Sequence, residues 1–409
     1  MYQMSNIEKE IIKNIENNFM NKIDFPEYSQ LMLYLHNIFA YTGQFNIMYC
    51  NSFIQESVQL LKNALILYKK GFFDCAFYSI RQSSEVIDNM LFLAKSPKDK
   101  LKEWKSKEYF PVDAKIRKQL KQLSEDYNEI KTLLPDFFNH HEELINKIHK
   151  IIHKQGYDTF YQLRTPINVK FSGFVQEKET KLFLETLKYT IGKLLILLVV
   201  LDPMCLALSD ERVIYKVSLK LMTEPIDTSF FEEVLELDDI IDKIKNSNYY
   251  KNFISFFDDK EELLPATYSV IQETYWNIDK LDEIQSQLHL LSMDEVLMFN
   301  ILKSGIKISI FYLAGGWCWY TTSNTQIMHE FSINTRDFQN YAQATSRFNQ
   351  NRKNVYISVL KYSPDDFLFV EHNTPLNTEE INILLNLEKQ HLEYVKMCQN
   401  EVNKILDLE

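Results

Sequence analysis

Apolar positions in the first half of the chain follow the period of a helix. Val58, Leu61, Leu65 and Tyr68 recur at spacings of three and four residues, which places them on one buried helix face. Glycine and proline are scarce, so few breakers interrupt the pattern. The patterning predicts helices over residues 5–21, 28–42, 52–70, 72–95, 113–132, 135–155 and 176–201.

The most apolar run, Leu194 to Leu201, is followed directly by Asp202-Pro203. It is only eight residues long, whereas a membrane span needs about 20 apolar residues. We therefore predict a buried helix that ends before the proline, and no membrane association. The N-terminus is charged, and the five cysteines are scattered without a C-x-x-C pair. Both features are typical of a cytoplasmic protein with reduced thiols.

Near the C-terminus, the pattern of residue types changes from that of helices to that of strands. Residues 306–322 are rich in β-branched and aromatic side chains and are interrupted by Gly315-Gly316, which predicts a hairpin. Residues 355–361 and 367–371 predict two further strands, joined by a turn at 363–366. Helices are expected near 335–347 and 378–406, with Asn377 or Thr378 as the cap of the latter.

Charge is also distributed unevenly along the chain. Residues 1–220 carry 30 basic and 26 acidic side chains, a balance of +4, whereas residues 221–409 carry 15 and 30, a balance of −15. Only the first part is suited to bind a polyanion. We predict a mainly α protein in three parts: a helical bundle over 1–220, an acidic helical segment over 221–303, and a small α+β domain with a short antiparallel sheet over 304–409.

A basic strip follows the fourth predicted helix. Residues 95–121 hold ten basic and four acidic side chains, with aromatic residues between them. Such a strip can hold a nucleic-acid backbone and stack bases, although a solvated connector with docked aromatics explains the same pattern. The candidate nucleic-acid-binding residues are Lys98, Lys102, Trp104, Lys105, Lys107, Lys115, Arg117 and Lys118.

Two helical stretches carry polar side chains at helical spacing. In the first, Ala76, Arg81 and Glu85 follow a Gly-aromatic turn in the order A-x4-R-x3-E. In the second, NKIHKIIHK, His149 and His153 lie one turn apart. Polar groups within apolar helices cost stability unless they are paired or used. A buried Arg81–Glu85 pair that locks two helices explains the first stretch without any catalysis.

Together these stretches resemble the HEPN-like helical domains of bacterial defence and toxin systems. The resemblance covers about residues 50–210 and implies an up-and-down helical bundle that often dimerises. Many such domains cut RNA without a metal, using an arginine and a histidine on a late helix with four to six residues between them. The implied activity is that of a metal-independent endoribonuclease, with no cofactor, with tRNA or another RNA as partner, and with a second copy or another protein bound.

The expected arginine is absent from the histidine's own helix. The positions five to seven residues before His153 hold Ile148, Lys147 and Asn146. Lys147 could supply the cation, but without the planar fork that arginine offers a phosphate. A histidine could move the proton of a ribose 2′-hydroxyl while a cation stabilises the phosphate charge. The candidate catalytic residues are Arg81, Glu85, Lys147, His149 and His153.

The sequence contains no convincing set of metal ligands. His149 and His153 have the spacing of two ligands, with Glu142 on nearly the same helix face, but a closed site needs further ligands from elsewhere. Glu371-His372 with Asp365-Asp366 could suggest a metal nuclease, but a strand end and a turn explain these residues better. No metal site is predicted.

Two functions are compatible with these patterns. In the first, the HEPN-like half of a cytoplasmic defence or toxin protein binds or cuts RNA, and the C-terminal half senses a trigger or holds a partner. In the second, the bundle is a non-catalytic scaffold that dimerises or docks to another defence component. If His153 is sealed under apolar side chains, the catalytic interpretation fails.

Overall fold

The protein is mainly helical and divides into two compact units. The computed structural model describes residues 5–19, 25–37, 41–108, 113–160, 177–218, 220, 222–313, 317–322, 335–352 and 354–405. The first unit comprises Met1–Ile214 and Met222–Asp259, and the second comprises Tyr215–Leu221 and Lys260–Glu409. The expected division at 220 and 303 therefore differs from the structure, because the acidic segment is shared between the two units.

Helices make up the first unit, and the predicted helices are present. They are α1 (Asn6–Phe19), α2 (Glu27–Asn37), α3 (Cys50–Lys69), α4 (Phe73–Lys95), α5 (Lys98–Lys105), α6 (Asp113–Leu123), α7 (Glu125–Leu133), α8 (Pro135–Ile152), α10 (Glu177–Leu201), α11 (Met204–Ala207), α12 (Glu211–Ile214), α13 (Ile240–Lys245) and α14 (Asn248–Ser255). The helix predicted over 113–132 is two helices, because the Ser124 side chain caps α7 by accepting a hydrogen bond from the amide of Tyr127. The short α5 was not predicted.

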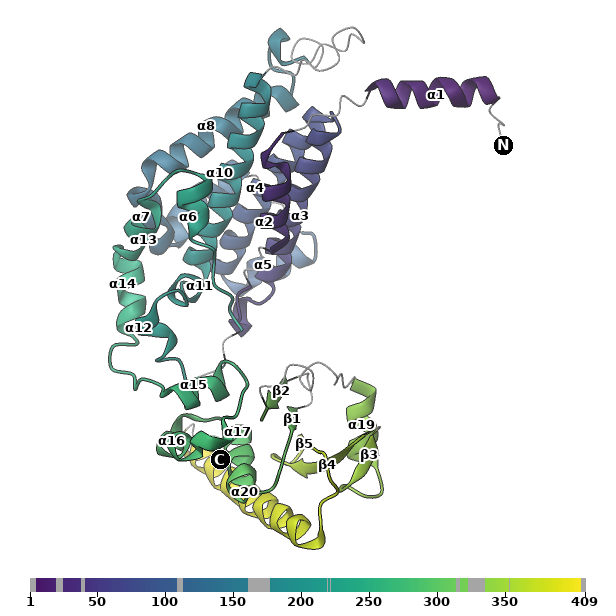
Figure 1. The fold of residues 1–409 in the computed structure, drawn as a ribbon. Helices are drawn as coiled ribbons and strands as arrows, with labels where there is room; N and C mark the ends of the chain where they lie inside the picture. Colours follow the sequence, from purple (N-terminus) through teal and green to yellow (C-terminus); the bar gives the residue numbers. More distant parts are fainter. Residues whose placement is uncertain are drawn as a thin grey trace. The chain divides into compact units, whose positions relative to one another are not determined.

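The first unit is organised around α4, which packs against α3, α6, α8 and α10 (Figure 1). Gly71 joins α3 to α4 with a φ of 87°, a left-handed conformation that suits glycine. Stacked rings of Tyr68 and Phe183, with centroids 3.8 Å apart, join α3 to α10. These contacts form a helical bundle with α4 in its centre.

The apolar end of α10 is the most buried stretch of the first unit. Residues from Leu194 to Leu201 are all nearly inaccessible, and the helix ends at Leu201, as predicted. The next residue, Asp202, is buried and accepts hydrogen bonds from Thr42 Oγ1 at 2.7 Å and Thr223 Oγ1 at 2.9 Å. Within the described ranges, no helix has the length and apolar character needed to cross a membrane.

The second unit places helices on a five-stranded antiparallel sheet. Its elements are α15 (Pro265–Ile271), α16 (Leu281–Ser286), α17 (Met293–Lys303), β1 (Ile310–Leu313), β2 (Trp317–Tyr320), α19 (Thr335–Gln343), β3 (Gln350–Arg352), β4 (Val355–Lys361), β5 (Phe367–His372) and α20 (Thr378–Ile405). The strand order is β2-β1-β5-β4-β3. The hairpin and the two further strands are confirmed, and Asn377 caps α20 through the amides of Glu379 and Glu380. The three-residue β3 is too short to show an alternating pattern.

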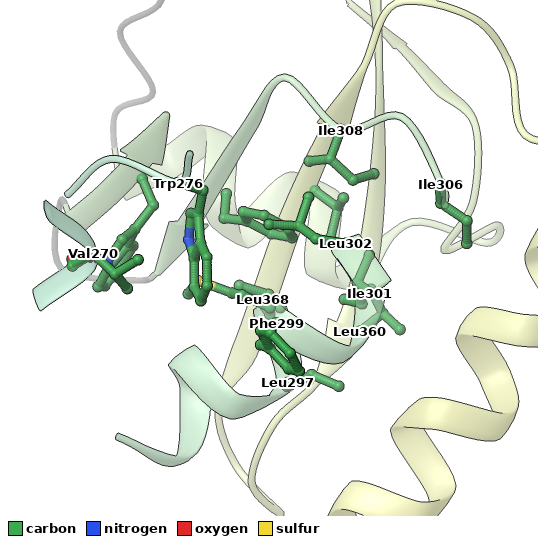
Figure 2. Close-up of a cluster of buried hydrophobic side chains, with 14 of the residues drawn as sticks. Val270, Trp276, Leu297, Phe299, Ile301, Leu302, Ile306, Ile308, Leu360 and Leu368 are labelled. Atoms are coloured by element: carbon green, nitrogen blue, oxygen red, sulfur yellow. Dashed lines mark hydrogen bonds between the residues drawn. The ribbon is translucent and has the colours of Figure 1, made fainter. Parts of the chain in front are cut away.

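Each face of this sheet has its own apolar cluster. On one face, Trp276, Leu297 and Phe299 pack with Leu360 and Leu368 of the sheet (Figure 2). On the other, Phe338 of α19 packs against strand residues that include Phe369, with ring centroids 4.7 Å apart. The second unit therefore has its own core.

Candidate functional site

Arg81, Glu85 and His153 form one hydrogen-bonded cluster between α4 and the end of α8. Arg81 Nε donates to Glu85 Oε1 at 2.9 Å, and Arg81 Nη2 lies 2.9 Å from the same oxygen. Arg81 Nη1 lies 2.8 Å from His153 Nε2. Because a guanidinium can only donate, His153 Nε2 accepts this hydrogen bond and the ring proton lies on Nδ1. The two stretches singled out in the sequence therefore meet through Arg81.

Local geometry fixes the last turn of α8 against the first turns of α4. His153 ends the helix, with its amide donating to the carbonyl of His149 at 3.0 Å. Lys154 then adopts a left-handed conformation with a φ of 54°, and its ammonium forms an ion pair with Asp74 near the start of α4. This ion pair, together with the Arg81–His153 contact, holds His153 beside α4.

His149 lies one turn before His153, and the two rings are 4.3 Å apart between centroids. Partial burial, followed by the positive charge of Arg81 and the nearby His153, lowers the pKa of His149 below its ordinary value. At neutral pH this imidazole is therefore uncharged and able to accept a proton. A neutral histidine beside a fixed cation is a suitable arrangement for general base catalysis.

The cluster is open to solvent on one side. The side chains of Arg81 and Glu85 are 25% and 24% exposed, His149 is half-buried and His153 is exposed. His153 is therefore not sealed beneath apolar side chains. The catalytic interpretation requires this exposure, because the histidine must reach the RNA. Partial removal of Arg81 from water also strengthens its attraction to an anion.

Lys147 does not belong to this cluster. It precedes His149 by two residues, which at 3.6 residues per turn places it about 200° away around α8. It is exposed, and it forms no hydrogen bond or ion pair with another residue in the described parts of the chain. The cation beside His153 is Arg81, from a different helix, and the expectation that Lys147 supplies it is not supported by the geometry.

The basic strip lies on α5, the loop after it, and α6. Its side chains are exposed at Lys98, Lys102, Lys105, Lys107, Lys115 and Lys118, whereas Arg117 is half-buried. Trp104 packs on Phe53 of α3 with ring centroids 5.0 Å apart, and this fits the docked-aromatic alternative. Part of the charge is neutralised within α5, since Lys100 pairs with Glu103 at 2.6 Å. Tyr109 and Phe110, which also belong to the strip, lie outside the described residues.

The histidines of α8 have partners other than a metal. His140 Nε2 lies 2.8 Å from Glu185 Oε1, and His141 is buried against Thr190. Desolvation, with Lys193 and other cations nearby, lowers the pKa of His141 well below its ordinary value. Among the residues that the structure describes, no three histidine, cysteine or acidic side chains converge as metal ligands.

In the second unit, Glu371 and His372 belong to the end of β5 and point to opposite faces of the sheet. His372 Nε2 lies 2.9 Å from Ser358 Oγ, and Nδ1 lies 2.7 Å from the carbonyl of Thr374. Glu371 accepts a hydrogen bond from the Tyr312 hydroxyl at 3.4 Å on the other face. The two side chains therefore cannot share one metal ion, which favours the strand-end interpretation.

Glu371 makes the stability of the second unit sensitive to pH. The carboxyl is 3% exposed, and desolvation raises its pKa from an ordinary value of 4.5 to about 7. The folded state therefore binds a proton that the unfolded state has lost between these two values. The contribution of Glu371 to stability is fully present below pH 4.5 and is lost as the pH rises through about 7, by about 3 kcal/mol for a shift of this size.

We expect Glu371→Gln to remove most of this dependence, because glutamine is neutral throughout the range. Urea unfolding of the second unit, followed at pH 5 and pH 8, measures the effect. The wild-type protein should lose stability on going to pH 8 by more than the variant does. Equal pH dependence in the two proteins would contradict the assignment of this pH dependence to Glu371.

The bundle also contains a buried polar network that sequence patterns did not predict. Lys193 Nζ of α10 donates to Asp88 Oδ2 at 2.7 Å and to Ser84 Oγ at 3.0 Å, both on α4. The side chains of Lys193 and Asp88 are 4% and 0% exposed. Lys193 precedes an apolar run, and Asp88 follows Glu85 by three residues. Neither position indicates that its side chain pairs with a residue 105 positions away in the sequence.

Comparison with known proteins gives no family for this chain. No family model, no curated protein and no solved structure matches the sequence or the fold.

Proposed function

We propose that the first unit binds RNA and cleaves it without a metal, as a HEPN-like domain of a bacterial defence or toxin-type protein. The observation that carries this proposal is the contact of 2.8 Å between Arg81 Nη1 and His153 Nε2 at a solvent-reachable surface. It supplies an arginine beside the histidine although the histidine's own helix has none at the expected positions. The second unit is proposed to sense a trigger or to hold a partner.

Arg81 meets the chemical demand better than Lys147 would. A guanidinium is planar and always charged, and it donates from fixed positions, so one edge can pair with a carboxylate while another nitrogen faces a ligand. Glu85 occupies Nε and Nη2, so it orients the group and leaves Nη1 on the side of His153. When a proton binds His153 Nε2, the hydrogen bond from Nη1 is lost, and Nη1 becomes available to a phosphate oxygen.

The proposed reaction is transfer of the phosphodiester to the neighbouring ribose 2′-oxygen. His149, neutral at pH 7, takes the proton of the 2′-hydroxyl as its oxygen bonds to phosphorus. Arg81 stabilises the negative charge that develops on the non-bridging oxygens. His153, in its protonated form, gives a proton to the departing 5′-oxygen. The products are a 2′,3′-cyclic phosphate and a 5′-hydroxyl, and neither a metal nor a cofactor takes part.

The exposed lysines of α5 and α6 are proposed to contact the RNA backbone. Side chains such as Lys98, Lys115 and Lys118 can neutralise phosphates without reading sequence. Trp104 is a poor stacking platform, because one side of its ring faces Phe53. The strip would therefore add affinity that depends on salt, and little sequence preference.

A scaffold function is the second candidate, and exposed aromatic residues beside the cluster favour it. Tyr78 on α4 is 54% exposed, and Tyr157 just after α8 is 77% exposed. Exposed aromatic side chains are frequent in the contact surfaces of protein partners. In this alternative, the surface that carries Arg81 and His153 docks a second copy or another defence component and performs no chemistry.

Metal-free incubation with total RNA and with tRNA distinguishes the two candidates. Cleavage in the presence of EDTA by the wild-type protein, and its loss in His153→Ala, is the expected result. His289→Ala is the matched control, since His289 is an exposed, ion-paired histidine of the second unit. Cleavage that persists in His153→Ala would remove this site from consideration. Absence of both cleavage and salt-sensitive RNA binding would favour the scaffold.

A further inference from the structure

An open groove of about 540 Å³ lies at the beginning of α8, within the first unit. Its walls come from the first turns of α8, from Tyr189 of α10, and from residues 237–243. The volume falls within the range of about 300–1,000 Å³ that is typical of small-molecule sites. The cluster of Arg81 and His153 lies at the other end of α8, so the groove is separate from the proposed RNA site.

Negative charge dominates the polar part of this groove. Asp136 and Glu143 are exposed, lie seven residues apart on α8, and both line it. Seven residues are nearly two helical turns, which separates the two carboxylates by about 10 Å along one face of the helix. Asp239 also lines the groove, but it is paired with Lys243 at 2.5 Å and so adds no net charge.

The groove also borders the acidic segment that the proposed RNA chemistry does not use. Five further acidic side chains lie within a few residues of its 237–243 wall and strengthen the negative field: Glu232, Glu233, Glu236, Asp238 and Asp242. A concave surface with charge of one sign raises the local concentration of ligands of the opposite sign.

Aromatic and aliphatic side chains form the remaining walls. The rings of Phe137 and Tyr189 stack with centroids 5.2 Å apart, and His140 meets the Tyr189 ring edge-on at 4.6 Å. Burial and the charge of Glu185 raise the pKa of Tyr189, so its side chain stays neutral and adds uncharged aromatic surface to the wall. Leu237 and Ile240 add aliphatic surface.

These features together select a class of ligand. A divalent metal needs oxygen ligands that converge within about 2.6 Å of one point, whereas these carboxylates are spread along the groove. A chain of methylenes with cationic groups matches both the separated carboxylates and the apolar walls. We propose that this groove binds a linear aliphatic polyamine, with ammonium groups at Asp136 and Glu143 and the methylene stem against Tyr189.

Calorimetric titration of the full chain with spermidine tests the proposal. Asp136→Asn and Glu143→Gln should each weaken spermidine binding by about fivefold, in line with the loss of one solvent-exposed charge pair. Glu211→Gln is the matched control, because it removes an exposed acid of the first unit that neither lines the groove nor belongs to the acidic segment beside it. Its affinity should stay within about twofold of the wild type.

Three results would overturn the proposal. The first is absence of spermidine binding, and the second is an equal loss in Glu211→Gln, which would indicate a general charge effect. The third is tighter binding of a lysine-rich peptide that depends on the same two carboxylates, since the groove would then serve a protein partner. Circular dichroism of each variant confirms that the bundle is folded, so that a loss of binding reports on the groove.

Discussion

Replacing Arg81 by alanine is expected to lower the rate of RNA cleavage by about 10²-fold or more, the usual effect of removing one donor that stabilises a transition-state charge. Arg81→Lys should recover only part of the rate, because a lysine keeps the charge but loses the planar group that Glu85 orients. Single-turnover cleavage of a labelled RNA in EDTA measures both effects. Because Arg81 is 25% exposed, neither substitution should unfold the bundle.

Arg212→Ala is the matched control for this series. Arg212 is also an arginine of the first unit that is paired with a carboxylate, at 2.6 Å from Asp210, but its side chain is 77% exposed. Its removal should leave the cleavage rate unchanged. If Arg81→Ala cleaves RNA as fast as Arg212→Ala does, then Arg81 does not act on the phosphate.

Replacing Lys193 by alanine is expected to cost about 3–5 kcal/mol of unfolding free energy, the usual penalty for leaving one partner of a buried ion pair uncompensated. Asp88 is fully buried, and its Oδ1 already lacks a hydrogen-bond partner among the described residues. Removal of Lys193 would leave this carboxylate without its cation. Urea unfolding of the first unit measures the loss.

The double substitution Lys193→Met with Asp88→Leu should recover most of this loss, because apolar side chains of similar volume need no solvation. Recovery would show that the penalty comes from an uncompensated charge and not from a cavity. A loss below about 1 kcal/mol in Lys193→Ala would show that water reaches the pair. If the double variant folds, it should also keep the wild-type cleavage rate, since neither residue belongs to the proposed site.

Much of the fold follows from local patterns. The apolar spacing within α3, the glycine between α3 and α4, and the apolar run of α10 each act over a few residues, and all were predictable. The division of the acidic segment was not, because the side on which residues 222–259 pack depends on the faces that the bundle presents. The split between α6 and α7 depends on one capping serine, Ser124, within a continuous helical pattern.

Sequence patterns singled out the residues of the Arg81–Glu85–His153 cluster, but they did not predict which residues make contact across helices. Arg81 and Glu85 pair at i and i+4, a distance that sequence spacing fixes. The contact between Arg81 and His153 spans 72 residues, and it depends on how α8 packs against α4. Lys147 was proposed because a motif was expected on one helix, whereas the structure supplies the cation from another. The Lys193–Asp88 pair was missed for the same reason, since each partner is a single charge in an apolar stretch.

The central claim is that Arg81, His149 and His153 direct attack by a ribose 2′-hydroxyl without a metal. The most direct measurement uses a synthetic RNA and the same RNA with a single 2′-deoxynucleotide at the cleaved position, both in EDTA. The proposed mechanism predicts that the first is cut to a 2′,3′-cyclic phosphate, and that the second binds with similar affinity but is not cut there. Cleavage of the deoxy-substituted RNA at that position, or cleavage only with added magnesium, would contradict the claim.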